Sequence, residues 1–222
     1  MKQVLAGIFL SLLALPAAAH SLDGLEAEIL AREPGVRFLP EPGMALPAVD
    51  LKDVAGKVAR LEDYRGKILV LVLVPSSCNE PCLRQGAALA RIQQDVAVGH
   101  MTDLVRFVGV SLAEAGAMRT ARADLGGAAK LDPANWTALA GVDAAAIQRF
   151  TAGLAGATAN ASPSEATYVI DGAGRLRARF LGTDFDPLDV VLYVNALLND
   201  HDDHDDDAPP PRSLWATLKA WF

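Results

Sequence analysis

The sequence predicts an α/β layered fold with a mixed central sheet, and three observations support this prediction. Two apolar runs, 68–75 and 104–112, lack the polar alternation of a half-exposed strand, which is typical of strands buried on both faces. Segments with helical spacing of apolar residues alternate with these runs, as in layered α/β folds. A turn at 171–174 joins two strand-like runs into a hairpin, so antiparallel strands should extend the sheet.

The first residues, MKQVLAGIFLSLLALPAAAHS, have the layout of a secretory signal. An early Lys2 is followed by an apolar run to Leu15 and by small residues suited to cleavage after Ala19. The alternative is an uncleaved membrane anchor, but the run is shorter than the roughly 20 apolar residues that a span needs. We therefore expect residues 1–19 to be a signal peptide and the protein to be exported to the periplasm, or membrane-anchored if cleavage does not occur.

An arm and a hairpin are predicted before the first central strand. Residues 20–35 form an N-terminal arm with a short helix that ends at Pro34-Gly35. The segment LPAVDLKDVAGKVARLEDYRGK has turn signals at Ala55-Gly56 and Arg65-Gly66 between short alternating runs, which indicates a hairpin. The buried strand 68–75 follows.

The remaining elements complete one domain over residues 36–198. They are a helix at 80–97, a strand at 104–112, a Gly- and Ala-rich helix at 114–125, a loop at 130–141, a helix at 143–156 with Asp143 as its N-cap, a hairpin at 165–180 and a closing helix at 186–198. This order predicts a thioredoxin-like three-layer fold with an inserted N-terminal hairpin.

The chain's two cysteines, Cys78 and Cys82, lie on the predicted turn from the first central strand into the first long helix. Side chains at such a turn reach the functional edge of the sheet, and the helix N-terminus stabilises a thiolate, so we expect both sulfurs to be exposed and readily ionised. A separation of four residues places both sulfurs on one face, so they can bond to each other or share one ion. A purely structural bridge would add little stability because it closes a very short loop. Inert burial is the other alternative, but the polar neighbours Ser76, Asn79 and Glu80 disfavour it.

The residues alone are compatible with several functions. The C-x-x-x-C spacing is wider than the usual redox C-x-x-C and suits a soft cation such as Cu(I) between two thiolates. A thiol–disulfide oxidoreductase without a stable metal would use Cys78 to attack and Cys82 to resolve. A peroxidase normally adds a Thr and an Arg; Arg84 is near, but no Thr precedes Cys78. A binding module on the same scaffold is the last alternative.

Four segments carry a further resemblance: "LPAVDLKDVAGKVARLEDYRGKILVLVLV", the C-x-x-x-C, "NWTALAG" and "ATYVIDGAGRL". In this order the chain resembles the SCO/SenC proteins of respiratory oxidase assembly. The resemblance implies copper held by Cys78, Cys82 and a downstream histidine, for delivery to the copper-binding subunit of cytochrome c oxidase or to another copper or thiol protein. It also implies a thiol reductase role toward the cysteines of that copper centre.

This sequence departs from the family pattern at several positions. Asn79 and Leu83 stand where a Pro usually follows each cysteine, and the acidic pattern after the second central strand is reduced to "VSLAEAGAM". The ligand histidine normally stands eight residues before the hairpin Asp; here that position is Pro163, before Asp171. Two thiolates alone can hold Cu(I) but hold Cu(II) poorly. Pro163 could instead be the cis-proline of thioredoxin-like reductases. The absence of an imidazole at this position favours the thiol–disulfide function.

Other histidines could supply weak additional ligands. His20 becomes the first residue if cleavage follows Ala19, and His201 and His204 lie in an acidic tract; we expect His100 to be a solvated surface residue. Residues 199–211 are expected to form an acidic His-, Asp- and Pro-rich linker.

The segment 212–222 has apolar residues at helical spacing and predicts a short amphipathic helix. It could contact a membrane surface or a partner groove, or fold back onto its own domain. The net charge is −7 and no basic cluster is present, so nucleic acid is excluded as a partner.

Overall fold

The computed structural model describes residues 21–33, 37–112, 125, 127, 129–155 and 163–205. The helices are α1 (Leu22–Arg32), α2 (Glu80–Val98), α4 (Ala144–Ala155) and α5 (Pro187–Asp205), with the 3-10 turns η1 (Leu61–Tyr64) and η4 (Pro163–Glu165). The strands are β1 (Phe38–Ala45), β2 (Leu51–Lys52), β3 (Val58–Ala59), β4 (Ile68–Val74), β5 (Val105–Ser111), β6 (Trp136–Gly141), β7 (Ala166–Ile170) and β8 (Arg175–Leu181).

All eight strands join one mixed sheet in the order β1-β8-β7-β4-β5-β6-β2-β3. The strands β4, β5 and β6 run parallel at its centre. The C-terminal hairpin of β7 and β8 pairs antiparallel to β4, and β2 with β3 closes the other edge. The α/β fold with a mixed sheet and a small N-terminal hairpin is therefore confirmed.

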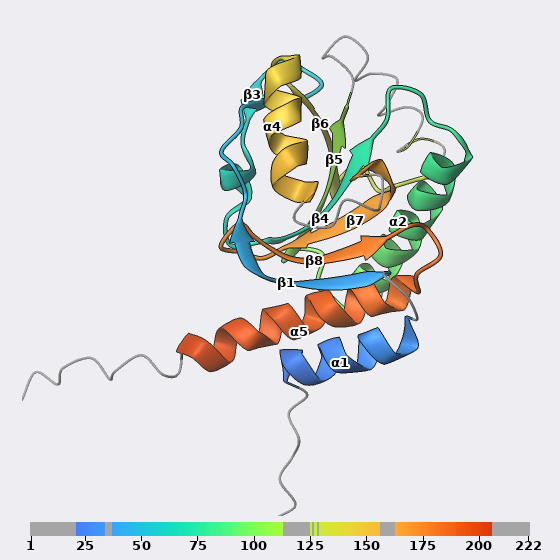
Figure 1. The fold of residues 1–222 in the computed structure, drawn as a ribbon, viewed down its shortest axis with the longest axis vertical. Coiled ribbons are helices and arrows are strands. Elements are labelled where there is room, and N and C mark those ends of the chain that lie inside the picture. The colour runs from blue at the N-terminus through green and yellow to red at the C-terminus, as the bar shows by residue number, and fades with distance from the viewer. Residues whose placement is uncertain are drawn as a thin grey trace, which may run out of the picture.

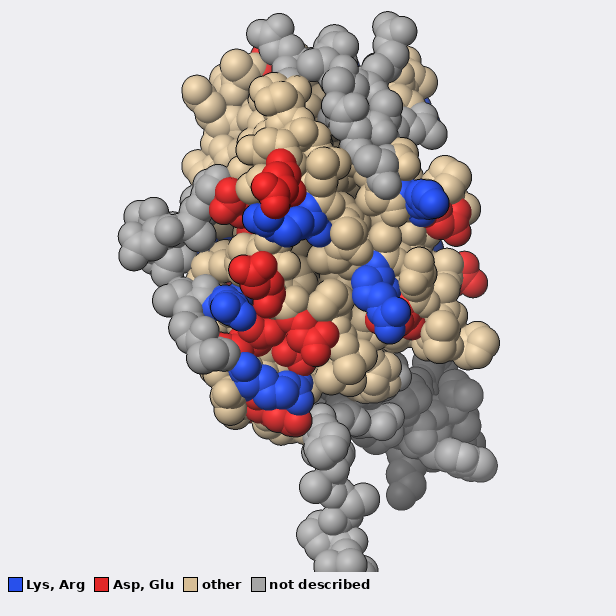
Figure 2. Space-filling view, turned by 90° about the vertical axis from the view of Figure 1, so that its right-hand side faces the viewer, with Lys and Arg blue, Asp and Glu red and all other residues tan. Residues whose placement is uncertain are grey.

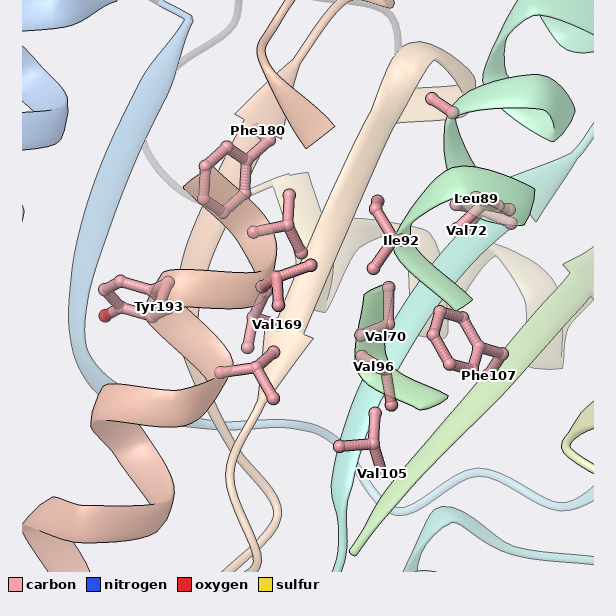
Figure 3. Packing of buried hydrophobic residues seen from close by; sticks show 14 of the residues in the cluster. Val70, Val72, Leu89, Ile92, Val96, Val105, Phe107, Val169, Phe180 and Tyr193 are labelled. Atoms are coloured by element: carbon pink, nitrogen blue, oxygen red, sulfur yellow. The ribbon is translucent and has the colours of Figure 1, made fainter. Parts of the chain in front are cut away.

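Helices cover both faces of the sheet and form two cores (Figure 1). All seven residues of β4 are buried because alternate side chains enter opposite cores. Val70 and Val72 face α2 and α5, where they meet Ile92 and other apolar side chains (Figure 3). Leu69 and the residues alternating with it face α4. Burial on both faces explains why β4 shows no polar alternation.

The N-terminal arm is a helix that packs on the outer side of α5. Ser21 caps α1 by accepting a hydrogen bond from the Gly24 backbone N–H, and Ile29 is fully buried. Arg32 pairs with the buried carboxylate of Asp189, and the Tyr193 hydroxyl donates to Glu26 at 2.8 Å. The arm is thus an additional layer of the domain.

One predicted element is wrong. Residues 136–141, expected to lie in a loop, form β6, a parallel partner of β5. The run WTALAG has few β-branched residues, and it becomes a strand because its small side chains fit against neighbouring elements. A β-carbon on Gly141, for example, would lie 2.5 Å from Ile147.

The other local predictions divide into confirmed and untested ones. The α4 N-cap is confirmed, since Asp143 accepts a hydrogen bond from the Ala146 N–H at 2.7 Å. The helix predicted at 114–125 lies almost wholly outside the described residues. The closing helix does not stop at 198, because α5 continues to Asp205, into the segment expected to be a linker. Within the described residues, no helix is long and apolar enough to cross a bilayer.

Candidate functional site

The turn between β4 and α2 positions both cysteines. The strand β4 ends at Val74, and α2 begins at Glu80 with Asn79 as its N-cap. The Asn79 side chain accepts a hydrogen bond from the backbone N–H of Cys82 at 3.4 Å. Pro81 occupies the first turn, where its missing N–H leaves no hydrogen bond unmade. Cys78 therefore precedes the helix, and Cys82 lies in its first turn.

The two sulfurs are joined in a disulfide, with the α-carbons 5.2 Å apart. Cys78 is half-buried at the surface turn, whereas Cys82 is only 3% exposed and packs in the core between the sheet and α2. The expectation of two exposed sulfurs is therefore wrong for Cys82, and Cys78 is half-buried rather than fully exposed. Burial of Cys82 follows from its helical position, since the face of α2 that carries it also carries Gln85 and Leu89.

The arrangement can exchange a disulfide. Cys78 is the less buried of the two cysteines and so the one that an incoming thiolate would attack, and the departing Cys82 thiolate would lie at the N-terminus of α2, where the helix dipole favours negative charge. Because the bridge closes a loop of only a few residues, it contributes little to the stability of the fold. A redox or metal-binding function of the two cysteines explains the bridge better than a structural one.

Two other segments meet at the first turns of α2. Gln85 is buried and donates from Nε2 to the carbonyl oxygen of Ala166 at 3.0 Å, which ties α2 to the start of β7. Arg84 donates to the Thr183 hydroxyl at 3.2 Å and pairs with Glu80, which brings the β8–α5 connection alongside. The roles of Asn79, Gln85 and Thr183 were not predicted from the sequence. Only Asn79 had a local signal, since Asn followed closely by Pro is typical of a helix start.

The position of the missing histidine ligand lies beside the thiol helix. Pro163 opens η4, and η4 packs against β4 and α2. The backbone of η4 therefore lies next to the strand and the helix that flank the disulfide turn. The peptide bond before Pro163 involves Ser162, which lies outside the described residues, so the cis-proline alternative is not tested.

The donor set fits Cu(I) better than Cu(II). In the described part of the chain, no three His, Cys, Asp or Glu side chains gather into a metal site. Once the disulfide is reduced, two adjacent thiolates remain, and Cu(I) accepts such soft, low coordination. Cu(II) would need an imidazole or another hard ligand that this site does not show.

Three histidines, His100, His201 and His204, lie elsewhere in the fold. His100 is exposed, as expected, and follows α2 at the end far from the cysteines, with a φ of 59°. His201 and His204 fall on the last turns of α5, whose first turn lies next to Thr183, so the helix carries them away from the disulfide. Their side chains and all of His20 lie outside the described residues.

Charges near α2 are mixed in sign. Figure 2 shows the face on the right-hand side of Figure 1, where Lys and Arg side chains lie beside Asp and Glu side chains with uncharged surface between them. The pairs Arg84 with Glu80 and Arg91 with Asp95 are examples along α2. Among the described residues of this face, no continuous basic stripe of the kind that binds a phosphate backbone is present.

Comparisons with known proteins agree with this fold. The model of the AhpC/TSA family matches residues 42–179. No curated protein sequence matches the chain. A solved SCO1/SenC family lipoprotein from Bacillus anthracis is similar with a TM-score of 0.58 and 18% identity, over 71% of this chain and 96% of that one.

Two further solved structures are informative. BsSco, a member of the Sco family of cytochrome c oxidase assembly proteins with a described disulfide switch, has a TM-score of 0.58 and 16% identity, over 71% of this chain and 95% of that one. Yeast Sco1 with copper bound has a TM-score of 0.52 and 13% identity, over 77% of this chain and 97% of that one. At these identities the likeness confirms the resemblance to SCO/SenC proteins in fold.

Proposed function

The chain belongs to the AhpC/TSA family, and from this premise we propose that it is an exported SCO-like protein. Its role is copper delivery to, or thiol maintenance of, the copper centre of cytochrome c oxidase. Cys78 and Cys82 bind the copper or exchange the disulfide. The observation that carries the proposal is the disulfide itself, which joins a half-exposed sulfur to a buried one at the start of α2.

The thiol reaction follows from the different burial of the two sulfurs. In the reduced protein, the Cys78 thiolate attacks a disulfide of the client, and one client cysteine leaves as a thiolate. The Cys82 thiolate then attacks the sulfur of Cys78, releases the second client cysteine and forms the Cys78–Cys82 disulfide. The client gains two electrons and this protein loses two, which yields the oxidised state that the structure contains.

Copper carriage uses the same two sulfurs in the reduced state. The copper-bound yeast Sco1 has a similar fold, which supports copper as the cargo. Without a third ligand, two-coordinate Cu(I) would exchange readily with a client site that has more thiolates or an imidazole. A peroxidase is not favoured, since Arg84 is engaged by Glu80 and Thr183.

Export is part of the proposal. The signal-like segment 1–19 supports it, and the disulfide suits an oxidising compartment such as the periplasm.

One pair of measurements separates copper carriage from thiol exchange. The reduced protein is titrated with Cu(I) against a competing chelator, and in parallel its reduction of a model protein disulfide is followed. We expect one-to-one Cu(I) binding that is lost in Cys78→Ser and in Cys82→Ser. His100→Ala, an exposed change at the far end of α2, is the control and should bind as the wild type does.

The outcomes assign the function. Binding without disulfide turnover supports delivery, and turnover without binding supports thiol maintenance. If the reduced protein neither binds Cu(I) nor reduces a protein disulfide, the proposal is wrong and the bridge is structural.

A further inference from the structure

A second feature lies at the N-terminal end of β4, whereas the disulfide follows its C-terminal end. A cavity of about 400 Å³ opens where β4 begins. It is lined almost entirely by apolar groups, from Gly66, Ile68, Gly172, Ala173, Leu197 and Leu198. Two tight turns form one wall, because Gly66 donates its N–H to the Gly172 carbonyl at 2.9 Å. A β-carbon on Gly172 would lie 3.4 Å from the Gly66 backbone, so the two turns approach each other closely.

The rim of this cavity is apolar and basic. Leu104 is 46% exposed, and its carbonyl accepts the Ile68 N–H at 2.9 Å, so it continues the apolar surface outward. The Arg65 guanidinium lies over the second turn, 2.8 Å from where a β-carbon on Gly174 would be. Lys67 is half-buried nearby and donates to the carbonyl of Asp103 at 2.7 Å. The site therefore suits a ligand with an apolar side chain and a flanking negative charge.

The chain itself contains such a ligand. The last helix lines the cavity with Leu197 and Leu198 and ends at Asp205. After it come Asp206 and Asp207, a proline run, and then 212–222, which contains Leu214, Trp215, Leu218, Trp221 and Phe222.

The length of this connection permits a return to the cavity. The helix rises about 10 Å from Leu198 to Asp205 at roughly 1.5 Å per residue. Residues 206–213 can span up to about 26 Å when extended. A cavity of this size is at the small end of the range of about 300–1000 Å³ for ligand pockets, and suits one or two large apolar side chains.

We propose that the segment 212–222 docks intramolecularly into the cavity formed by the 66 and 172–173 turns and the end of α5. An aromatic side chain of the segment fills the apolar hollow, while Asp206 and Asp207 pass close to the cations Arg65 and Lys67. The acidic run before the segment would be repelled by an anionic lipid surface, which disfavours membrane docking.

The test measures acrylamide quenching of tryptophan emission in the full chain as the cell processes it. Subtracting the emission of the Trp215→Phe/Trp221→Phe variant removes the contribution of Trp136, which is only 8% exposed. We expect the remaining emission to be protected from quenching relative to a peptide of residues 206–222. Ala173→Glu places a carboxylate at the cavity rim, in an exposed turn, and should abolish the protection. Ala55→Glu, in an exposed turn between β2 and β3, is the matched control and should keep it.

Several results would overturn the proposal. The segment does not dock if its tryptophans are quenched like those of the peptide, or if Ala173→Glu retains the protection. Protection that vanishes on dilution would assign the cavity to a second copy of the chain. Protection that appears only with phosphatidylcholine or phosphatidylglycerol vesicles would assign the segment to a membrane.

Discussion

Asn79 shows how one residue organises the site at the smallest scale. It stands where the SCO/SenC pattern usually has a Pro, and the structure gives it a different task as the N-cap of α2. Its side-chain oxygen accepts the Cys82 N–H, which is one of the unpaired donors at the helix start. The cap therefore fixes where the helix begins between the two cysteines.

We predict that Asn79→Ala lowers the free energy of unfolding of the oxidised protein by about 1 kcal/mol, because a donor in the first turn of α2 loses its partner. Urea unfolding, with the disulfide intact in every variant, measures the difference. Asn79→Asp, which retains a capping oxygen, is the matched control and should remain close to the wild type. Equal losses in both variants would show that the side chain acts through something other than the cap.

At the scale of elements, β6 depends on one close approach. Gly109 in the middle of β5 lies against the indole of Trp136, the first residue of β6. A β-carbon on Gly109 would overlap the ring carbons of that indole, and it would also lie 3.2 Å from Val74. The absence of a side chain on β5 thus makes room for the largest side chain of its neighbour.

We predict that Gly109→Ala destabilises the protein by about 1–3 kcal/mol, because the indole is rigid and the core around it is closely packed. Thermal unfolding measures the loss of stability, and the near-ultraviolet circular dichroism of Trp136 reports the displacement of its ring. Gly127→Ala is the control, since a β-carbon there meets nothing within 4 Å. A stable Gly109→Ala variant with an unchanged tryptophan signal would contradict this account.

At the scale of the whole molecule, each of the two cores contains a buried tyrosine. Tyr168 lies in the core between the sheet and α4. Tyr193, a residue of α5, lies in the core on the other face of the sheet. Its hydroxyl contacts Glu26 of α1 and the carbonyl of Arg177 in β8. Burial raises the pKa of Tyr168 to about 12, against a smaller opposing effect of Arg179. Burial, and then the Glu26 carboxylate, also raises the pKa of Tyr193.

These raised pKa values predict sensitivity to alkali. Below the ordinary tyrosine pKa of 10.0, both hydroxyls are protonated in the folded and unfolded states. Above it only the unfolded state releases its protons, so the free energy of unfolding falls as the pH rises. Ionisation of Tyr168 in the unfolded state alone should lower the free energy of unfolding by about 2–3 kcal/mol by about pH 12.

Urea unfolding at a series of pH values from about 8 to 11 measures this dependence. In Tyr168→Phe the slope above pH 10.0 should be shallower, whereas its slope at lower pH should be unchanged. An identical slope in the variant would show that other groups cause the alkaline loss.

Long-range contacts explain which expectations failed. The two turns of the chain that carry the strongest local signals, the β4–α2 turn and the hairpin at 171–174, were placed correctly. β6 was not, because the side chains that make WTALAG a strand belong to β5 and α4. The acidic segment after 198 lacks apolar spacing, yet its first residues continue α5. The burial of Cys82 also depends on the core that α2 meets rather than on the residues next to it.

The sequence by itself determined the alternation of strands and helices, the mixed sheet and the location of both cysteines at the start of the first long helix. These features follow from apolar periodicity and turn residues, which act over a few positions along the chain. Only the tertiary structure decided that Cys78 is half-buried while Cys82 is buried, that α1 packs on α5, and that an apolar cavity opens beside Leu197 and Leu198. Burial and cavities arise where distant segments meet, and no short stretch of sequence specifies which segments those are.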